Sequence, residues 1–92
     1  MQSFADKDTE HVWERKFVRR FGPELTRMAH RKLQTVDAAE SVSDLASPPG
    51  NRLEQLTGDR AGQHSIRINS QWRICFRWEQ AGPEDVEIVD YR

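Results

Sequence analysis

Residues 64–78 read HSIRINSQWRICFRW, and residues 86–91 read VEIVDY. Apolar and polar side chains alternate in both runs, which is the period of a β-strand with one buried face. Residues 69–71 (Asn-Ser-Gln) predict a tight hairpin connection, and residues 80–83 (Gln-Ala-Gly-Pro) predict a looser one. The second half of the chain therefore predicts an antiparallel meander, to which residues 52–56 can add a short strand.

The first half of the chain has helical periodicity instead. A first helix is expected to begin at Asp8 or Thr9, and Pro23 suits the first turn of a second helix. The first helix is expected to include Val12, Trp13, Phe17, Arg19 and Arg20. In the second helix, apolar residues recur at helical spacing up to Val36. Residues 41–44 fit a capping box for one further short turn, and residues 47–50 (Ser-Pro-Pro-Gly) end the helical part.

Helices followed by strands indicate an α+β fold. We expect two N-terminal helices, with a short third, to pack on one face of a mainly antiparallel sheet of three to five strands. The 92 residues correspond to a single domain over 1–92, with its helical part at about 8–46 and its sheet part at about 52–92.

The composition excludes several classes of protein. Apolar residues make up 36% of the chain and charged residues 32%, and no stretch is long and apolar enough to span a membrane. No basic and then apolar leader opens the chain, so a cytoplasmic protein without a membrane partner is expected. Cys75 is the only cysteine, and no Cys/His spacing indicates a metal site; we expect neither metal nor cofactor.

Positive charge is concentrated in the middle of the chain. The net charge is −1, yet residues 50–78 carry five arginines against Glu54 and Asp59, whereas residues 79–92 are acidic. Arginine presents a planar fork that suits phosphate. The middle segment is therefore where an anionic partner would bind, although a solvated charged surface is the ordinary alternative.

Alternation assigns the strand residues to two faces of the sheet. The face toward the helices is expected to carry Ile66, Ile68, Trp72, Ile74, Phe76, Trp78, Val86 and Ile88. The opposite face is expected to carry Ser65, Arg67, Arg73, Cys75, Arg77, Glu87, Val89 and Tyr91. Arginines can hold phosphates and a tyrosine can stack on a base, so this second face suggests single-stranded RNA as a ligand. The alternative is a solvated polar face, with Glu87 opposing an arginine.

Three sequence segments resemble a known family when taken together. They are residues 58–67 (GDRAGQHSIR), 72–74 (WRI) and 89–91 (VDY). The combination resembles the RelE superfamily of bacterial toxins, and within it the HigB family that includes GraT-like toxins; the likeness covers nearly the whole chain. It implies a RelE-like fold and cleavage of messenger RNA on the ribosome, which inhibits translation. It also implies a cognate helix-turn-helix antitoxin, through which DNA would be contacted only indirectly.

The resemblance assigns roles to individual residues. Cleavage in this family needs no metal, because a nucleotide's own 2′-hydroxyl attacks the adjacent phosphate. Arg73 matches the family arginine that stabilises the phosphate, and Tyr91 matches the terminal aromatic that positions a base. Asp90 matches the adjacent aspartate, which would orient a neighbour or act as base, although alternation directs it toward the helices.

Three positions depart from the family pattern. Glu54, Thr57 and Arg92 stand where HigB proteins commonly have histidine, lysine and histidine. Glu54 is a candidate base, whereas Thr57 cannot replace a lysine and Arg92 supplies only charge. Catalysis is therefore expected to depend on charge and on positioning by the ribosome, and to be slow.

The remaining arginines of the second half are candidate contacts to RNA or ribosome: Arg60, Arg67, Arg77 and Arg92. Arg60 and Arg67 could instead stabilise the turn at residues 58–62. The nuclease interpretation requires guanidinium groups and the Tyr91 phenol to meet in one solvent-open hollow. Two other hypotheses remain, namely a toxin-like co-repressor that does not cut RNA and a plain RNA-binding module.

Overall fold

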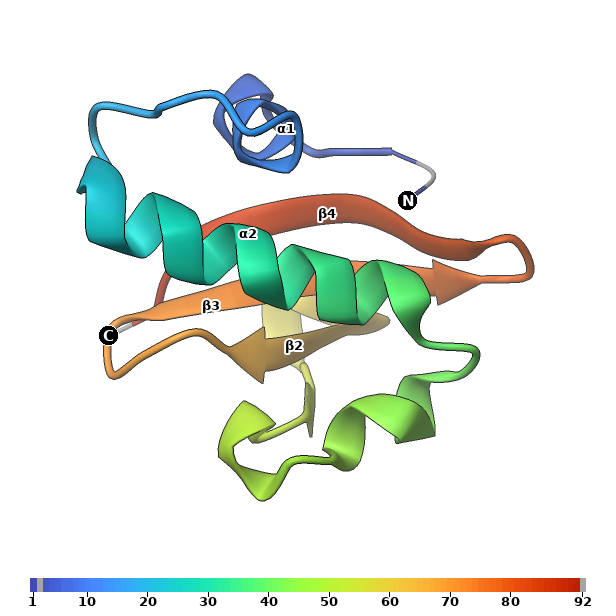
Figure 1. The fold of residues 1–92 in the computed structure, drawn as a ribbon. Helices are drawn as coiled ribbons and strands as arrows, with labels where there is room; N and C mark the ends of the chain where they lie inside the picture. The colour runs from blue at the N-terminus through green and yellow to red at the C-terminus, as the bar shows by residue number, and fades with distance from the viewer. Residues whose placement is uncertain (2, 92) are drawn as a thin grey trace.

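A computed structural model describes residues 1 and 3–91 of the chain. Within these residues, two α-helices lie on one face of a four-stranded sheet (Figure 1). The helices are α1 (Lys7–Trp13) and α2 (Gly22–Ala38), and the strands are β1 (Glu54–Gln55), β2 (Gln63–Arg67), β3 (Trp72–Glu79) and β4 (Gly82–Asp90). Short 3₁₀ turns are η1 (Val42–Ala46), η2 (Pro49–Asn51) and η3 (Gly58–Arg60). The α+β class and the helix-on-sheet arrangement are as predicted.

The first helix is shorter than the sequence predicted. Its N-cap is Asp6 and neither Asp8 nor Thr9, because the Asp6 carboxylate accepts a hydrogen bond from the Thr9 backbone N–H at 2.7 Å. It ends at Trp13, and Arg15 takes a φ of +64°, in the left-handed region that cannot continue a right-handed helix. Phe17, predicted as an apolar helix position, therefore lies in the loop before α2 and is 63% exposed.

The second helix and the turn after it follow the prediction. Pro23 lies in the first turn of α2, where the missing N–H costs nothing. Its buried residues Leu25, Ala29, Leu33 and Val36 form the stripe that faces the sheet. η1 begins with the predicted capping box, in which the Asp44 carboxylate accepts from the backbone N–H of Ser41.

The sheet has the strand order β1-β2-β3-β4, with antiparallel pairing throughout. One cross-strand row joins Glu54, Ser65, Cys75 and Glu87, so these four side chains share a face. β4 begins at Gly82, which leaves only Gln80 and Ala81 between β3 and β4, a shorter connection than predicted. A register shift occurs between Cys75, which pairs with Glu87, and Arg77, which pairs with Glu84; the extra residue of this bulge is therefore in β4.

The main core lies between the helices and the predicted apolar face of the sheet. Ile66, Ile74 and Phe76 are fully buried there, and Val12 of α1 and Leu33 of α2 pack into the same cluster. The backbone N–H of Ile88 donates to Thr9 Oγ1 at 3.0 Å, so a buried hydroxyl of α1 bonds directly to β4. This hydrogen bond fixes α1 over the last strand.

The opposite face of the sheet is not the solvated surface that alternation predicted. Three of its residues are buried, namely Ser65, Arg73 and Cys75. Leu56 after β1 is also buried, and Arg60 of η3 reaches Glu87 on β4 with an Nη1–Oε1 distance of 3.2 Å. The segment between β1 and β2 therefore folds over this face, which the pattern of a single strand cannot reveal.

Candidate functional site

Arg73 is the centre of the candidate site, and its guanidinium is held by the protein itself. Nε donates to Ser65 Oγ at 2.8 Å, and Nη2 donates to the backbone carbonyl of Arg52. Arg52 has a φ of +45°, a left-handed conformation that ends η2 and directs the chain toward β1. Arg73 is only 7% exposed as a result. Its position on β3 was predicted, but its burial was not.

Glu54 provides a carboxylate beside this cation. It lies on the edge strand β1, and its Oε1 is 3.5 Å from Nη1 of Arg73. The Glu54 side chain is 52% exposed, whereas that of Arg73 is 8% exposed. The pair therefore presents a solvent-facing proton acceptor next to a cation that solvent reaches only slightly.

Tyr91 completes this cluster, and Asp90 lies elsewhere. The guanidinium carbon of Arg73 is 5.7 Å from the centroid of the Tyr91 ring, which is a cation–π distance, and Tyr91 is 44% exposed. Asp90 pairs with Trp72, whose side is the helix-facing one, and its Oδ2 accepts from Gln71 Nε2 at 3.1 Å. The structure thus brings together Arg73, Glu54 and Tyr91, and it places Asp90 on the side that alternation predicted.

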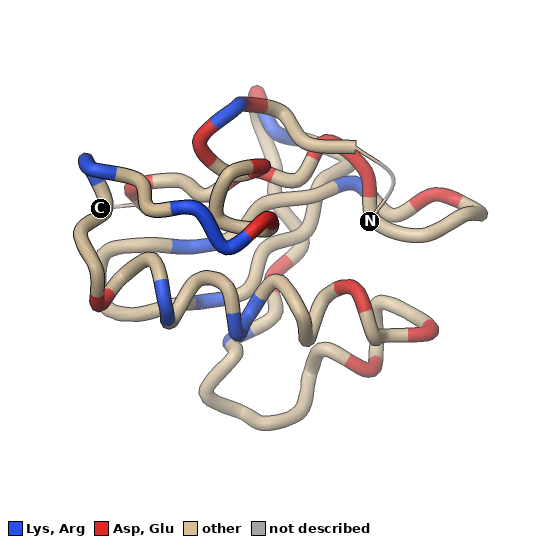
Figure 2. Tube along the Cα trace, turned by 45° about the horizontal axis from the view of Figure 1, so that its top comes forward, with Lys and Arg blue, Asp and Glu red and all other residues tan. Residues whose placement is uncertain are grey.

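The other predicted arginines do not form an open cationic surface. Arg60 contacts Glu87, Arg77 Nε lies 3.3 Å from Asp85 Oδ2, and Arg67 Nε donates to the Asn69 carbonyl at 3.0 Å. Figure 2 shows that positions of both charge signs are distributed over the Cα trace. The solvent-open hollow that the nuclease interpretation requires therefore stays a prediction, and of the arginines expected around it Arg60 and Arg77 are in ion pairs. Arg92 lies outside the described residues.

The turn before β2 favours the alternative role for Arg60. Its Nη1 donates to Gln63 Oε1 at 3.0 Å as well as to Glu87, so it ties η3 to β2 and β4. Alternation had also allowed Glu87 to oppose an arginine across strands. Glu87 instead lies opposite Cys75, and the arginine that it contacts is Arg60 of η3.

Cys75 lies opposite Glu87 and is a poor candidate for a nucleophile. It is fully buried, and burial raises the pKa of its thiol despite the opposing positive charges of Arg60 and Arg73. The thiol is therefore protonated at neutral pH. Among residues 1 and 3–91, no three His, Cys, Asp or Glu side chains are grouped so that they could hold a metal ion.

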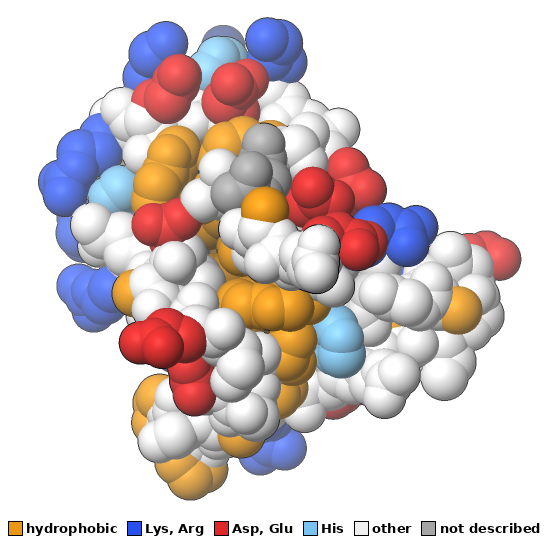
Figure 3. Space-filling view, turned by 90° about the vertical axis from the view of Figure 1, so that its right-hand side faces the viewer, with side chains coloured by type: hydrophobic (Ala, Val, Ile, Leu, Met, Phe, Trp, Pro, Cys, Tyr) orange, Lys and Arg blue, Asp and Glu red, His pale blue; other side chains and the backbone are white. Residues whose placement is uncertain are grey.

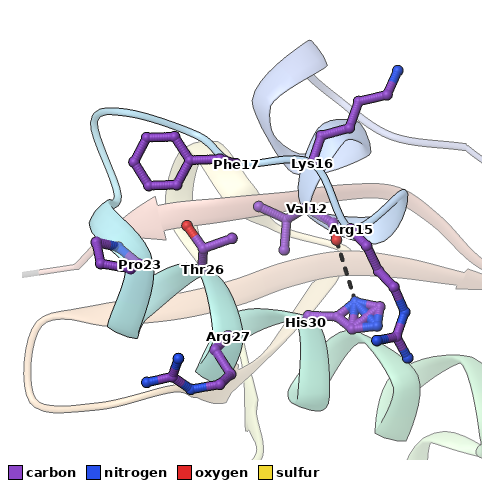
Figure 4. Close-up of a pocket in the computed structure, with 8 residues that line it drawn as sticks. All are labelled: Val12, Arg15, Lys16, Phe17, Pro23, Thr26, Arg27 and His30. Atoms are coloured by element: carbon purple, nitrogen blue, oxygen red, sulfur yellow. Dashed lines mark hydrogen bonds between the residues drawn. The ribbon is translucent and has the colours of Figure 1, made fainter.

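A second feature escaped the sequence analysis. A pocket of about 300 Å³ lies between the end of α1, the loop after it and the first turns of α2 (Figure 4). The available signal was the run RKFVRR at residues 15–20, in which an aromatic residue lies among basic ones. Arg19 and Arg20 of this run were instead assigned to a longer first helix.

Comparisons with known proteins agree with this fold. A family model described as the RelE-like toxin of the type II toxin-antitoxin system HigB matches residues 2–92. Toxin HigB-1 of Vibrio cholerae is 45% identical over 76 residues, which is 82% of this chain and 80% of that protein. Endoribonuclease HigB of Proteus vulgaris is 25% identical over 91 residues, 99% of this chain and 98% of that protein. No helix within the described part of the chain is long and apolar enough to cross a membrane.

Proposed function

Because this chain belongs to the HigB family of RelE-like toxins of type II toxin-antitoxin systems, we propose that it arrests translation by cutting messenger RNA on the ribosome. The proposed site of action is the cytoplasm, where a cognate helix-turn-helix antitoxin holds the toxin inactive. A toxin of a type II system has a cognate antitoxin as its partner. We propose the ribosome and messenger RNA as two further partners.

The observation that carries the proposal is the cluster of Glu54, Arg73 and Tyr91. RNA cleavage by its own 2′-hydroxyl needs an acceptor for the 2′ proton and a cation for the charge that develops on phosphorus. Glu54 is the acceptor, and Nη1 of Arg73, 3.5 Å from it, is the cation. The exposed ring of Tyr91 stacks on a base beside the scissile bond.

The reaction follows from these positions. The 2′-oxygen gives its proton to Glu54 and bonds to phosphorus, which forms a 2′,3′-cyclic phosphate. The bond to the 5′-oxygen breaks, and this oxygen takes a proton from solvent. Arg73 donates hydrogen bonds to the non-bridging oxygens while their negative charge increases.

The burial of Arg73 sets a condition on this mechanism. A phosphate can reach the guanidinium only where Glu54 now lies, because Ser65 and the Arg52 carbonyl occupy its other donors. We infer that ribosome-bound messenger displaces the Glu54 side chain from Nη1 while keeping it within reach of the 2′-hydroxyl. Cleavage of free RNA is then expected to be much slower than cleavage on the ribosome.

The same burial favours a second candidate function. Arg73 is enclosed, Arg60 and Arg77 are ion-paired, and Thr57 stands where the family commonly has lysine. A chain with these features could bind its antitoxin and act with it as a transcriptional co-repressor without cutting RNA. A third candidate, a plain RNA-binding module, requires tight binding to free RNA with a steep dependence on salt.

One assay separates the first two candidates. The purified chain is incubated with 70S ribosomes and a translated messenger, and the cleavage ends are mapped by primer extension, with ribosome-free messenger as control. Ribosome-dependent cleavage that Glu54→Gln slows supports the proposal. An intact messenger, together with antitoxin-dependent binding to operator DNA, would establish the co-repressor instead.

A further inference from the structure

The pocket seen beside α2 lies on the helix-covered side of the sheet, away from Arg73. We call it the helix pocket. Val12, Phe17 and Pro23 form apolar parts of its wall, and Arg15, Lys16 and Arg27 surround it (Figure 4). Its volume of about 300 Å³ is at the lower end of the roughly 300–1,000 Å³ of ligand pockets. It therefore has room for one small group and not for a folded partner.

The charge around the helix pocket is positive. No carboxylate is among the described residues that line it. Lys16 pairs with Glu14 at 3.2 Å, but within residues 1 and 3–91 neither Arg15 nor Arg27 is in an ion pair. Basic side chains also gather along one edge of the molecule in Figure 3. Two unpaired guanidinium groups beside one pocket select an anionic ligand, most specifically a phosphate.

The aromatic residue that lines the helix pocket, Phe17, indicates which kind of anionic ligand the pocket would bind. Phe17 is 63% exposed at the pocket, although an exposed phenyl ring gains nothing in water. In Figure 4 the Phe17 ring lies at the left of the pocket, the Arg15 side chain lies at the right beside His30, and Arg27 extends from α2 below. A flat ring combined with phosphate-binding cations is the combination by which proteins hold unpaired nucleotides.

His30 adds an unused hydrogen-bond acceptor. Its Nδ1 lies 3.2 Å from the Val12 carbonyl, an acceptor only, so Nδ1 carries the proton and Nε2 carries a lone pair. Nε2 is buried without a hydrogen-bond partner in the described part of the chain, and the Arg15 side chain lies beside the ring (Figure 4). A ligand that draws Arg15 aside and donates an O–H would satisfy this nitrogen.

We propose that the helix pocket binds one unpaired RNA nucleotide, with its base against Phe17 and its phosphate held by Arg15 and Arg27. The ribose 2′-hydroxyl is the donor for His30 Nε2. The choice of RNA as the partner rests on the proposed function, but the pocket and the catalytic cluster lie on opposite sides of the sheet. The ribosome could therefore be held at the helix pocket while the messenger occupies the cluster at Glu54 and Arg73.

An NMR titration of the full chain with adenosine 5′-monophosphate tests this inference. This nucleotide contains base, ribose and phosphate but no internucleotide bond, so the result does not depend on whether the chain cleaves RNA. We expect shifts at Phe17, Arg27 and the His30 ring. Phe17→Ala should weaken binding roughly 5- to 100-fold, the range expected for losing one base stack. Arg27→Gln should weaken it several-fold, while the control Lys7→Gln, which changes an exposed cation on α1, should have no effect.

Three results would overturn the inference. The first is an absence of shifts at the helix pocket, and the second is an equal effect of inorganic phosphate alone, which would show only an anion site. The third is a glutamate-rich peptide that shifts the same resonances at lower concentration than the nucleotide, which would indicate an acidic protein partner. Nucleotide binding in a chain that cuts no messenger would instead contradict the proposed function alone.

Discussion

Nε of Arg73 donates a hydrogen bond of 2.8 Å to Oγ of Ser65 across the β2–β3 pair, where Ser65 is fully buried and Arg73 is almost so. The residue that best matches a phosphate ligand is therefore also part of the fold. Ser65 Oγ and the Arg52 carbonyl would lose their donors if Arg73 were removed. Experiments on Arg73 have to separate these two roles.

Arg73→Ala is expected to lower the free energy of unfolding by about 2–4 kcal/mol, because it leaves buried acceptors unsatisfied and an ion pair broken. Urea denaturation followed by circular dichroism measures this loss. Ser65→Ala is the matched control, since it keeps the guanidinium and removes one acceptor of a charged donor, and it should cost about 1.5–3 kcal/mol with cleavage retained. An Arg73→Ala protein of unchanged stability would show that these hydrogen bonds contribute little. Loss of toxicity in Arg73→Ala alone is therefore not evidence for catalysis.

Glu54→Gln is the cleaner test of the chemistry. The amide keeps the shape of the side chain but cannot accept the 2′ proton, so the rate of ribosome-dependent cleavage should fall roughly 10²- to 10⁴-fold. Stability should change by less than about 1 kcal/mol, because the carboxylate is half exposed and its ion pair is screened. Single-turnover cleavage on 70S ribosomes measures the rate, with Glu79→Gln at the exposed end of β3 as control. An unaltered rate would contradict the role of Glu54 as base and would leave Tyr91 as the candidate within the cluster.

The alternation of the strands predicted the sheet, its order and its apolar face, because burial on one side imposes a period of two on the sequence. It could not show what covers the other side. Burial of Cys75 and Ser65 depends on Leu56 and Arg60, which are separated from them in sequence by a turn. A signal was nevertheless present, since cysteine is among the residue types most often buried and is unusual on a solvated strand face.

The candidate site was predicted in part for the same reason. Strand register places Glu54 opposite Ser65 and next to the row of Arg73, so pairing of the two charges follows from the fold. The Arg52 carbonyl that encloses the guanidinium depends on a left-handed backbone conformation, which an arginine rarely adopts and its sequence does not indicate. The early end of α1 has the same origin at Arg15. The enclosure of Arg73 and the early end of α1 both depend on a backbone conformation, which the pattern of side chains does not predict.

Thr9→Val tests how α1 is attached to the sheet. Valine fills nearly the same volume but leaves the Ile88 backbone N–H without its buried acceptor, so the free energy of unfolding should fall by about 1–3 kcal/mol. Thr9→Ser keeps the hydroxyl and loses one methyl group, and it should cost about 1 kcal/mol. Chemical denaturation of the parent chain, Thr9→Ser and Thr9→Val measures their free energies of unfolding, which should decrease in that order. A valine variant as stable as the parent would mean that water replaces the hydroxyl at Ile88.

The dependence of stability on pH should report on His30. Burial, assisted by the positive charge of Arg15, lowers the pKa of His30 in the folded chain below its ordinary value of about 6.5. Below that value the unfolded chain binds more protons than the folded chain does. The contribution of His30 is therefore fully present above about pH 6.5 and is lost as the pH falls toward the folded pKa.

The pocket around His30 determines the controls for this measurement. Arg15 from the loop is the charged group that opposes protonation of His30, and the other cations that line the pocket are Lys16 from the loop and Arg27 from α2. The urea concentration at the midpoint of unfolding should decrease between pH 7.5 and pH 5.5, and this decrease should be larger for the parent chain than for His30→Gln. Arg15→Gln keeps the side-chain length but removes the charge, so it should reduce the difference partly, because burial is the larger cause. If His30→Gln loses as much stability on acidification as the parent does, carboxylates elsewhere set the acid sensitivity and His30 is accessible to protons in the folded state.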